Sequence, residues 1–293
     1  MKLFLNICLF FFLLIRVFSE THTDKKYLLR TNSAAKVMGR EDRKDGVHSG
    51  NRVLTRIYNH GAIGDLSSAF SGVYPIGSGH AYIFEFSPVI AASVVDVNGN
   101  RKHIISDGTI GLTDDSPDGP PWSFEPLPGY ANPNQENLAM SDNVNSWPES
   151  WPNRSSDWDG EWNGQYGKYV RADQESYFVV DDYYNSEFDF WPDENDLPDS
   201  LSEDPDNHRR GLGIQLDVRG YQWNHPAAED ILIVTYWITN LGTNVLDSVV
   251  FGMYGDADVG GPSSFSDDDA WFDTENDMVF QWDHDNWLSL IHI

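Results

Sequence analysis

The stretch that decides the fold is Gly211–Gly261, which reads GLGIQLDVRGYQWNHPAAEDILIVTYWITNLGTNVLDSVVFGMYGDADVGG. Apolar and polar residues alternate over Ile214–Arg219, and this period of two is typical of a strand with one buried face. Over Glu229–Asn240 both alternating sets are largely apolar, which predicts a central strand covered on both faces. Turn residues at Leu241–Asn244 lead to a third strand at Val245–Tyr254. We expect it to pair antiparallel with the second, because so short a connection suits a hairpin.

The rest of the chain shows further strand patterns separated by turn residues. The dipeptide Asn98-Gly99 is the clearest hairpin signal, since both residues tolerate the positive φ of a type I′ turn. We therefore predict an all-β, sandwich-like domain of antiparallel sheets with long acidic, tryptophan-rich loops. The further strands are expected at Arg52–Tyr58, His80–Phe86, Val89–Val97, Arg101–Ser106, Tyr166–Val170, Ser176–Asp181 and Met278–Trp282.

Two long segments between the expected strands have compositions that exclude long regular elements. Asp107–Ser156 is rich in proline and tryptophan, so we expect a functional loop or a lid packed on the domain. Asp181–Asp206 holds eleven acidic residues and no Lys or Arg, and its prolines exclude a helix. We interpret it as an excursion that leaves the sheet and returns at Gly211.

The chain is strongly acidic, with 46 Asp and Glu residues against 19 Lys and Arg and a formal net charge of −27. Such a surface repels nucleic acid, so we expect no nucleic-acid partner, and it attracts cations. Aromatic residues make up 14% of the 293 residues, which predicts a sizeable core and excludes a chain that is disordered throughout.

The first 19 residues have the features of a secretory signal. Lys2 provides the positive start, Leu3–Leu14 the apolar run, and Ser19 a small residue before a cleavage site. The run is too short for a membrane span, so we expect no transmembrane span after its removal and predict a secreted or cell-surface protein. The only cysteine, Cys8, would leave with the signal, which excludes disulfides and a thiol nucleophile.

We expect four parts along the chain. Residues 1–19 are the signal, residues 20–51 a flexible spacer, and residues 52–287 the β-sandwich-like ectodomain. Residues 288–293 read LSLIHI, which looks like the translated end of a sequencing adapter. We therefore expect the natural chain to continue past Trp287.

The strongest candidate site is an array of aspartates at the end of the third expected strand. Calcium takes six to eight oxygen ligands, and aspartates two apart on a turn, followed by a second acidic loop, can supply several. The array does not match an EF-hand, because Gly260 is misplaced and no Glu ends the loop. A solvated acidic loop with aspartates as turn formers explains it equally well. The predicted Ca²⁺ ligands are Asp256, Asp258, Asp267, Asp268, Asp269 and Asp273.

Catalysis by a carboxylate pair is the alternative, since two acids flanking a sugar bond perform glycoside hydrolysis. With 46 acidic residues almost any pair can be nominated, so the signal is weak. Tryptophans in a β protein are also more often core than sugar platform. The nominated acids are Glu161, Asp181, Asp182, Glu187 and Asp189, and the nominated platforms are Trp158, Trp162 and Trp191.

Four motifs resemble a group of large exported proteins of environmental bacteria, most of them uncharacterised. The motifs are GVYPIGSGHAYIFEF from Gly72, RRGLGIQLDVRGYQW from Arg209, YWITNLG from Tyr236 and YGDADVGG from Tyr254. The resemblance implies export and a β-rich ectodomain, often followed by a carboxy-terminal secretion-sorting tail. No such tail stands here, and the resemblance carries no catalytic residue.

From these observations we expect a non-enzymatic structural or adhesion module, secreted or held at the cell surface. Its acidic loops would be ordered by calcium, and its partner would be an extracellular glycan or a surface protein. A secreted polysaccharide-degrading hydrolase remains the open alternative.

Overall fold

The computed structural model describes residues 12–16, 40–65, 70–109, 123–199, 203, 208–259, 267–276 and 278–284. Predictions for most of the signal, for residues 20–39 of the spacer and for the adapter-like residues 288–293 lie outside these ranges. The described part is all-β, as predicted, and its helical structure consists of short 3-10 turns at Arg40–Asp42, Val144–Ser146 and Ser156–Trp158. None of its helices is both long and apolar enough to cross a membrane.

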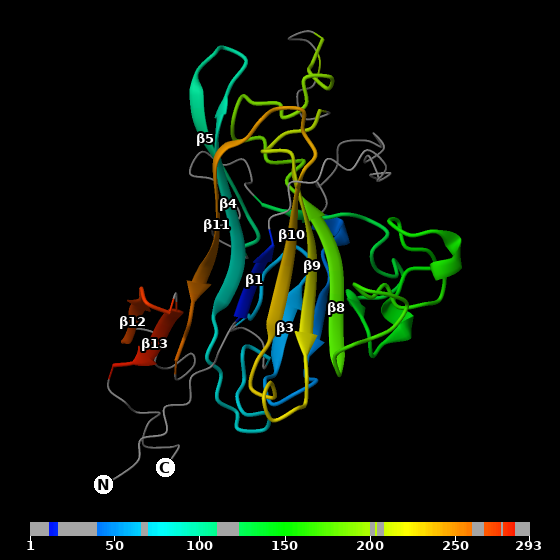
Figure 1. Ribbon diagram of the computed structural model, residues 1–293, viewed down its shortest axis with the longest axis vertical. Helices are drawn as coiled ribbons and strands as arrows, with labels where there is room; N and C mark the ends of the chain where they lie inside the picture. The colour runs from blue at the N-terminus through cyan, green and yellow to red at the C-terminus, as the bar shows by residue number, and fades with distance from the viewer. Residues whose placement is uncertain are drawn as a thin grey trace.

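The larger sheet has six strands in the order β1-β10-β9-β8-β6, and β7 also pairs with β8 (Figure 1). Neighbouring strands are antiparallel except β1 and β10, which are parallel. Its strands are β1 (Phe12–Arg16), β6 (Glu125–Pro126), β7 (Ala139–Met140), β8 (Gln174–Asp181), β9 (Ile214–Gln222) and β10 (Ile233–Asn240).

The smaller sheet has three antiparallel strands in the order β11-β4-β5. They are β11 (Asp247–Asp256), β4 (Glu85–Val95) and β5 (Arg101–Asp107). Two hairpins complete the described structure: β2 (Asp45–His48) with β3 (Thr55–Tyr58), and β12 (Asp268–Asp273) with β13 (Met278–Asp283). β2 lies inside the expected spacer, so the folded domain begins earlier than residue 52.

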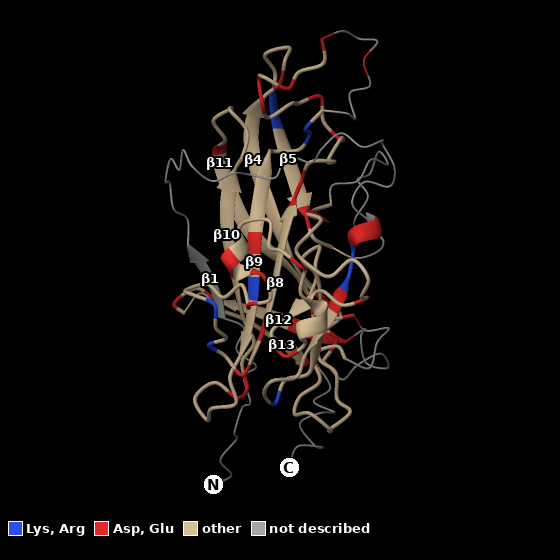
Figure 2. Ribbon diagram, turned by 90° about the vertical axis from the view of Figure 1, so that its right-hand side faces the viewer, with Lys and Arg blue, Asp and Glu red and all other residues tan. Residues whose placement is uncertain are grey.

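The main core lies between the two sheets and gives the molecule its sandwich-like form. Leu216 and Val218 of β9 and Tyr236 of β10 face Ile90 of β4 within one buried apolar cluster. The rings of Tyr236 and Phe251 meet at 5.3 Å between centroids. Each fully buried side chain of this size contributes about 1.5–3 kcal/mol relative to an exposed one. Charged residues lie mostly in loops, whereas the strands are largely uncharged (Figure 2).

A second core lies on the outer face of β8 and β9, beneath residues 123–173, which we call the tryptophan-rich lobe. Trp151 and Trp162 are buried there against Tyr177 of β8, and Trp147 and Trp158 pack around them. The rings of Trp151 and Trp162 meet edge to face at 5.9 Å. The described part of the proline- and tryptophan-rich segment therefore packs on the domain, which was one of the two expectations for it.

The lobe changes the expected environment of β9. The sequence predicts one buried face for this strand, but both of its faces are buried. Arg219 donates to the backbone oxygen of Asn163 in the lobe at 2.6 Å and stacks over the ring of Tyr177 at 3.8 Å. Asp217 accepts a hydrogen bond from the Tyr177 hydroxyl at 2.9 Å. The polar residues of β9 alternate because they serve this second interface, not because they face water.

The pairing expected for the third strand is wrong. β11 pairs antiparallel with β4 in the smaller sheet and not with β10. The connection is held by the backbone oxygen of Pro192, which accepts from the amides of Thr243 at 2.9 Å and Asn244 at 3.2 Å. The chain is thereby redirected across the sandwich, so a short connection joins the two sheets instead of closing a hairpin.

Three local predictions also need correction. Residues 80–84 are not a strand, since β4 begins only at Glu85, and Tyr166–Val170 has no strand. The hairpin at Asn98-Gly99 is confirmed by the pairing of β4 with β5, but among its residues only Gly99 has a positive φ, of 82°. The Asp96 carboxylate accepts from the amides of Asn98 and Asn100 and fixes the turn without a type I′ geometry.

Candidate functional site

The predicted calcium ligands fall into separate places in the structure. Asp258 and Asp268 lie together where the chain leaves β11 and enters β12, and the Val259 amide donates to Asp268 Oδ2 at 3.0 Å. Burial, followed by repulsion from the carboxylates of Asp258 and Asp283, raises the pKa of Asp268 to about 6. Burial, and then the charge of Asp256, also raises the pKa of Asp258.

The remaining aspartates point elsewhere. Asp269 follows Asp268 on the strand, so its side chain takes the opposite face, where it contacts His284 Nδ1 at 2.6 Å. Asp273 ends β12 and accepts from the amides of Glu275 and Asn276, which makes it a turn former. Asp267 offers its backbone oxygen to the His284 amide at 3.0 Å.

Within the described ranges, no three acidic, histidine or cysteine side chains are close enough to hold a metal ion together. Residues 260–266 and Asp277, which adjoin these aspartates, lie outside those ranges. The sequence prediction also missed Asp283, which stands opposite Asp268 in the β12–β13 register and is 4% exposed. Alternation does not identify it, because Val279 and Gln281 share its face of β13 and Val279 is 65% exposed, so the burial of Asp283 depends on tertiary packing.

Asp182, one of the carboxylates nominated for hydrolysis, is not accessible to a substrate. The side chain of Asp182 is fully buried and accepts from the amides of Leu212 and Ile214 and from Ser106 Oγ. Burial raises its pKa to about 6. These hydrogen bonds join Asp182 to β5 of the smaller sheet and to the start of β9 in the larger sheet. Asp182 therefore stabilises the fold at this point. Trp162 is also no sugar platform, because it is buried and donates to Glu175 Oε2 at 2.7 Å.

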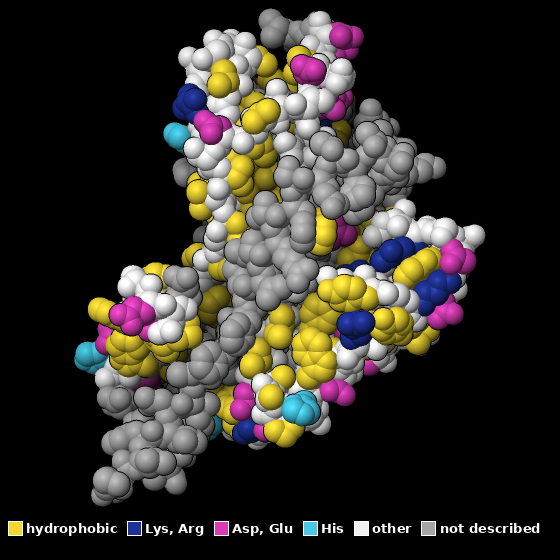
Figure 3. Space-filling view, in the orientation of Figure 1, with side chains coloured by type: hydrophobic (Ala, Val, Ile, Leu, Met, Phe, Trp, Pro, Cys, Tyr) yellow, Lys and Arg dark blue, Asp and Glu magenta, His cyan; other side chains and the backbone are white. Residues whose placement is uncertain are grey.

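A different group of side chains gathers on the outside of the tryptophan-rich lobe. In this region hydrophobic and basic side chains lie side by side on the surface (Figure 3). Tyr166 is 59% exposed and Tyr169 is 49% exposed, whereas Trp151 and Trp162 of the same lobe are buried. We call this group the aromatic–basic face, and it consists of Trp158, Tyr166, Lys168, Tyr169, Arg171 and Trp223.

Cations hold the rings of this face in place. The guanidinium of Arg171 lies 4.6 Å from the Tyr166 centroid and 5.5 Å from that of Tyr169, and it donates to the Tyr169 hydroxyl at 3.1 Å. The ammonium of Lys168 lies 5.5 Å from the Trp158 centroid. Such contacts contribute about 0.5–1 kcal/mol at exposed sites, and they fix the rings before any ligand arrives.

The face is also tied to the sheet beneath it. The Trp223 indole donates to the backbone oxygen of Arg171 at 3.1 Å, and its ring stacks on Tyr221 of β9 at 5.6 Å. The guanidinium of Arg154 also lies over the Trp158 ring, 4.2 Å from its centroid, and donates to Asn163 Oδ1 at 2.7 Å. The exposed rings therefore stand on a rigid support instead of a free loop.

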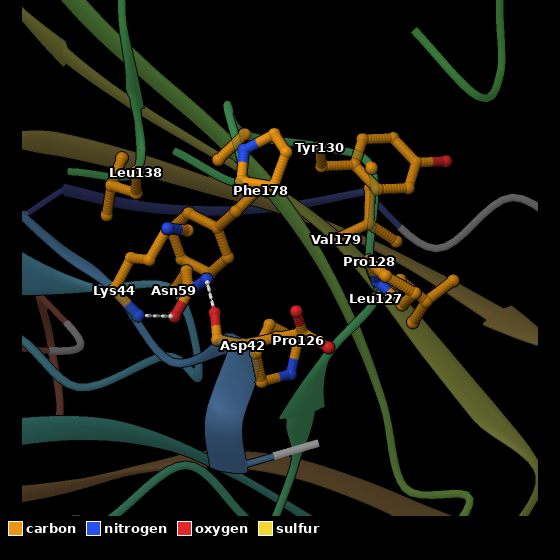
Figure 4. A pocket seen from close by; sticks show the side chains of 13 residues that line it. Asp42, Lys44, Asn59, Pro126, Leu127, Pro128, Tyr130, Leu138, Phe178 and Val179 are labelled. Carbon is orange, nitrogen blue, oxygen red and sulfur yellow. Dashed lines mark hydrogen bonds between the residues drawn. The ribbon is translucent and has the colours of Figure 1, made fainter. Parts of the chain in front are cut away.

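Two small hollows are among those that the described residues line. One has a volume of about 110 Å³ and lies between Lys44, Asn59 and the Pro126–Tyr130 segment (Figure 4). There Asn59 accepts from the Lys44 amide at 2.7 Å and donates to the Asp42 oxygen at 2.9 Å. The other, of about 200 Å³, lies beside Phe190 and Trp191. Both are smaller than the roughly 300–1,000 Å³ of typical ligand pockets, so the open face is the better candidate for a large ligand.

Only part of this face was visible in the sequence. Trp158 was nominated as a platform, whereas Tyr166 and Tyr169 were expected in a strand at Tyr166–Val170. Neither Arg171 nor Trp223 was nominated. The available signal was the spacing of aromatic and basic residues in YGKYVR, from Tyr166 to Arg171.

We compared the chain with models of protein families, with curated proteins and with solved structures. None of the three comparisons found a match. The case for a function therefore rests on the aromatic–basic face and on the aspartates around Asp268.

Proposed function

We propose that this chain is a secreted or cell-surface binding module, with an adhesive or structural role, that holds glycan on its aromatic–basic face. The observation that carries the proposal is the pair of exposed tyrosines, Tyr166 and Tyr169, held by Arg171 on a packed lobe. The expected signal and the resemblance to exported proteins support a location outside the cell.

The chemistry of the face suits a sugar polymer. One face of a sugar ring presents C–H groups, which pack on aromatic rings, and its edges present hydroxyl groups, which accept and donate hydrogen bonds. Tyrosine and tryptophan provide both an apolar face and a polar group, and arginine provides several donors. An open platform also accommodates a chain of any length, whereas the small hollows do not.

The test is retention on immobilised polysaccharides, read by affinity electrophoresis across a panel of neutral and acidic polymers. We expect at least one polymer to retard the protein, and Tyr166→Ala and Tyr169→Ala to weaken this retardation tenfold or more. Tyr254→Ala is the matched control, because Tyr254 is 36% exposed on β11 in the other sheet. Equal retardation of all three variants would show that the aromatic–basic face does not bind the polymer.

The same incubations address the hydrolase alternative. A binding module retains glycan and leaves it intact, so no new reducing ends are expected over the time of the binding measurement. New reducing ends that disappear on a single Glu or Asp substitution would instead identify an enzyme.

We also propose that calcium orders the region around Asp258 and Asp268. The support is electrostatic: the buried carboxylate of Asp258 and the half-buried one of Asp268 repel each other, and a divalent cation would relieve that repulsion. The ion would need oxygen ligands in addition to those that the described residues bring together.

A further inference from the structure

The outer edge of β10 carries a strand of unusual origin. β10 pairs with β9 on one side and, in parallel, with β1 on the other. The register joins Phe12 to Ile233 at one end and Arg16 to Trp237 at the other, so five residues of β1 extend the sheet (Figure 1). The edge of β10 therefore accepts an extended peptide in parallel orientation.

This strand belongs to the segment that the sequence predicts to be removed. Phe12–Arg16 lies within the apolar run of the expected signal, residues 1–19. In a protein that has lost this segment, the backbone groups of β10 that pair with β1 lose this pairing. An edge of this kind is a template for another strand.

The composition of β10 provides no protection against such pairing. Its sequence IVTYWITN contains β-branched and aromatic residues, with no charge and no proline. Other sheet edges differ in this respect. β6 has only two residues and ends in Pro126, β5 begins with Arg101 and Lys102, and β11 is irregular between Asp247 and Val250. Such features discourage strand addition, and β10 lacks them.

We propose that, in the exported protein, the outer edge of β10 is a strand-acceptor site that binds an extended apolar segment of a partner protein in parallel register. Backbone hydrogen bonds to Ile233–Trp237 provide the affinity, and the absence of proline and charge in the segment's centre is the requirement for binding. A second copy of this chain fits less well. Two β10 edges related by a two-fold axis would pair antiparallel, whereas the observed pairing is parallel.

The probe is a fluorescein-labelled peptide of residues 11–17, FFLLIRV, with a polar lysine tail. It is titrated against protein exported with its own leader, whose intact mass establishes the removal of residues 1–19. Fluorescence anisotropy should show saturable binding, and the same peptide with Leu14→Pro should bind at least tenfold more weakly. Equal binding of the two peptides, or none, would overturn the proposal, and so would an exported protein that retains residues 1–19.

Two lysine variants test the place of binding. Thr235 pairs with Leu14 inside the register, whereas Thr239 lies beyond its end at Trp237, on the same face of β10. Thr235→Lys should weaken binding at least tenfold and Thr239→Lys less than twofold, with melting curves confirming that both fold. Equal effects would contradict the assigned edge. Dimers that Thr235→Lys dissociates would assign the edge to a second copy and overturn the partner-segment proposal. Glycan retention is independent of each outcome.

Discussion

At the scale of single residues, two buried tyrosines differ in what their hydroxyl groups meet. The Tyr236 hydroxyl lies in the core between the sheets with no hydrogen-bond partner among the described residues. The Tyr177 hydroxyl lies beneath the tryptophan-rich lobe, where it donates to Asp217 Oδ1 at 2.9 Å and accepts from Asn153 Nδ2 at 2.8 Å. A buried polar group without a partner costs about 1–3 kcal/mol, whereas a satisfied one contributes about 1 kcal/mol.

The two tyrosines therefore give a matched pair of substitutions. Tyr236→Phe should raise the free energy of unfolding by about 1 kcal/mol, because it removes an unpaired hydroxyl and leaves the ring in place. Tyr177→Phe should lower it by about 1–3 kcal/mol, because it removes the donor to Asp217 Oδ1 and the acceptor of Asn153 Nδ2. Urea denaturation followed by tryptophan fluorescence measures both. A loss of stability in Tyr236→Phe would show that its hydroxyl has a partner.

The sequence shows which residues are acidic, but it does not show which of them lie together in the fold. Adjacent aspartates 267–269 suggested one array, but the alternation of a strand directs Asp268 toward Asp258 and Asp269 toward His284. That division follows from a pairing between β12 and β13 that local sequence does not specify. The burial of Asp182 likewise depends on Ser106, Leu212 and Ile214, which are distant in sequence.

At the scale of elements, the strands themselves were largely predictable and their partners were not. Alternation located β9 and a run with two apolar faces located β10, because such patterns reflect burial on a pleated sheet. Short strands were also expected at Ser176–Asp181 and Met278–Trp282, where β8 and β13 lie. Pairing depends on where a connection directs the chain. Between β10 and β11 the chain is held by Pro192, which lies outside the stretch Gly211–Gly261 from which the pairing was predicted. Tyr166–Val170 has a strand-like composition because its aromatic rings serve the surface of the lobe.

The tryptophan-rich lobe should depend on its buried tryptophans. Trp162→Ala should lower the free energy of unfolding by about 3–5 kcal/mol, since it leaves a cavity beside Trp151 and removes the donor to Glu175. Denaturation curves measure the loss, and limited proteolysis should show earlier cleavage within residues 123–173. Trp271→Ala is the control, because Trp271 is 66% exposed and its truncation should change stability by about 0.5 kcal/mol or less. Unchanged proteolysis in Trp162→Ala would show that the lobe does not need this anchor.

At the scale of the whole molecule, the charge of −27 favours cations everywhere on the surface, so specific calcium binding must be separated from general screening. Millimolar calcium should raise the melting temperature relative to chelator, and sodium chloride of equal ionic strength should raise it less. In the double variant Asp258→Asn, Asp268→Asn, the repulsion between these two carboxylates is removed without any metal. Its melting temperature in chelator should therefore exceed that of the unmodified protein, and calcium should add little more. An equal response to both salts, or a calcium response that survives the double variant, would remove calcium from this site.

The enclosure of β9 has a consequence for how the molecule opens. Its amides bond to β8 and β10, and side-chain layers cover the strand above and below. Hydrogen exchange at β9 should therefore proceed only through global unfolding, so its slowest amides report the stability of the entire domain. Amides of the lobe, such as those around Tyr166, should exchange through a smaller opening that leaves the sandwich intact. The difference between the exchange rates of the lobe and of β9 would give the free energy by which local opening of the lobe is easier than global unfolding.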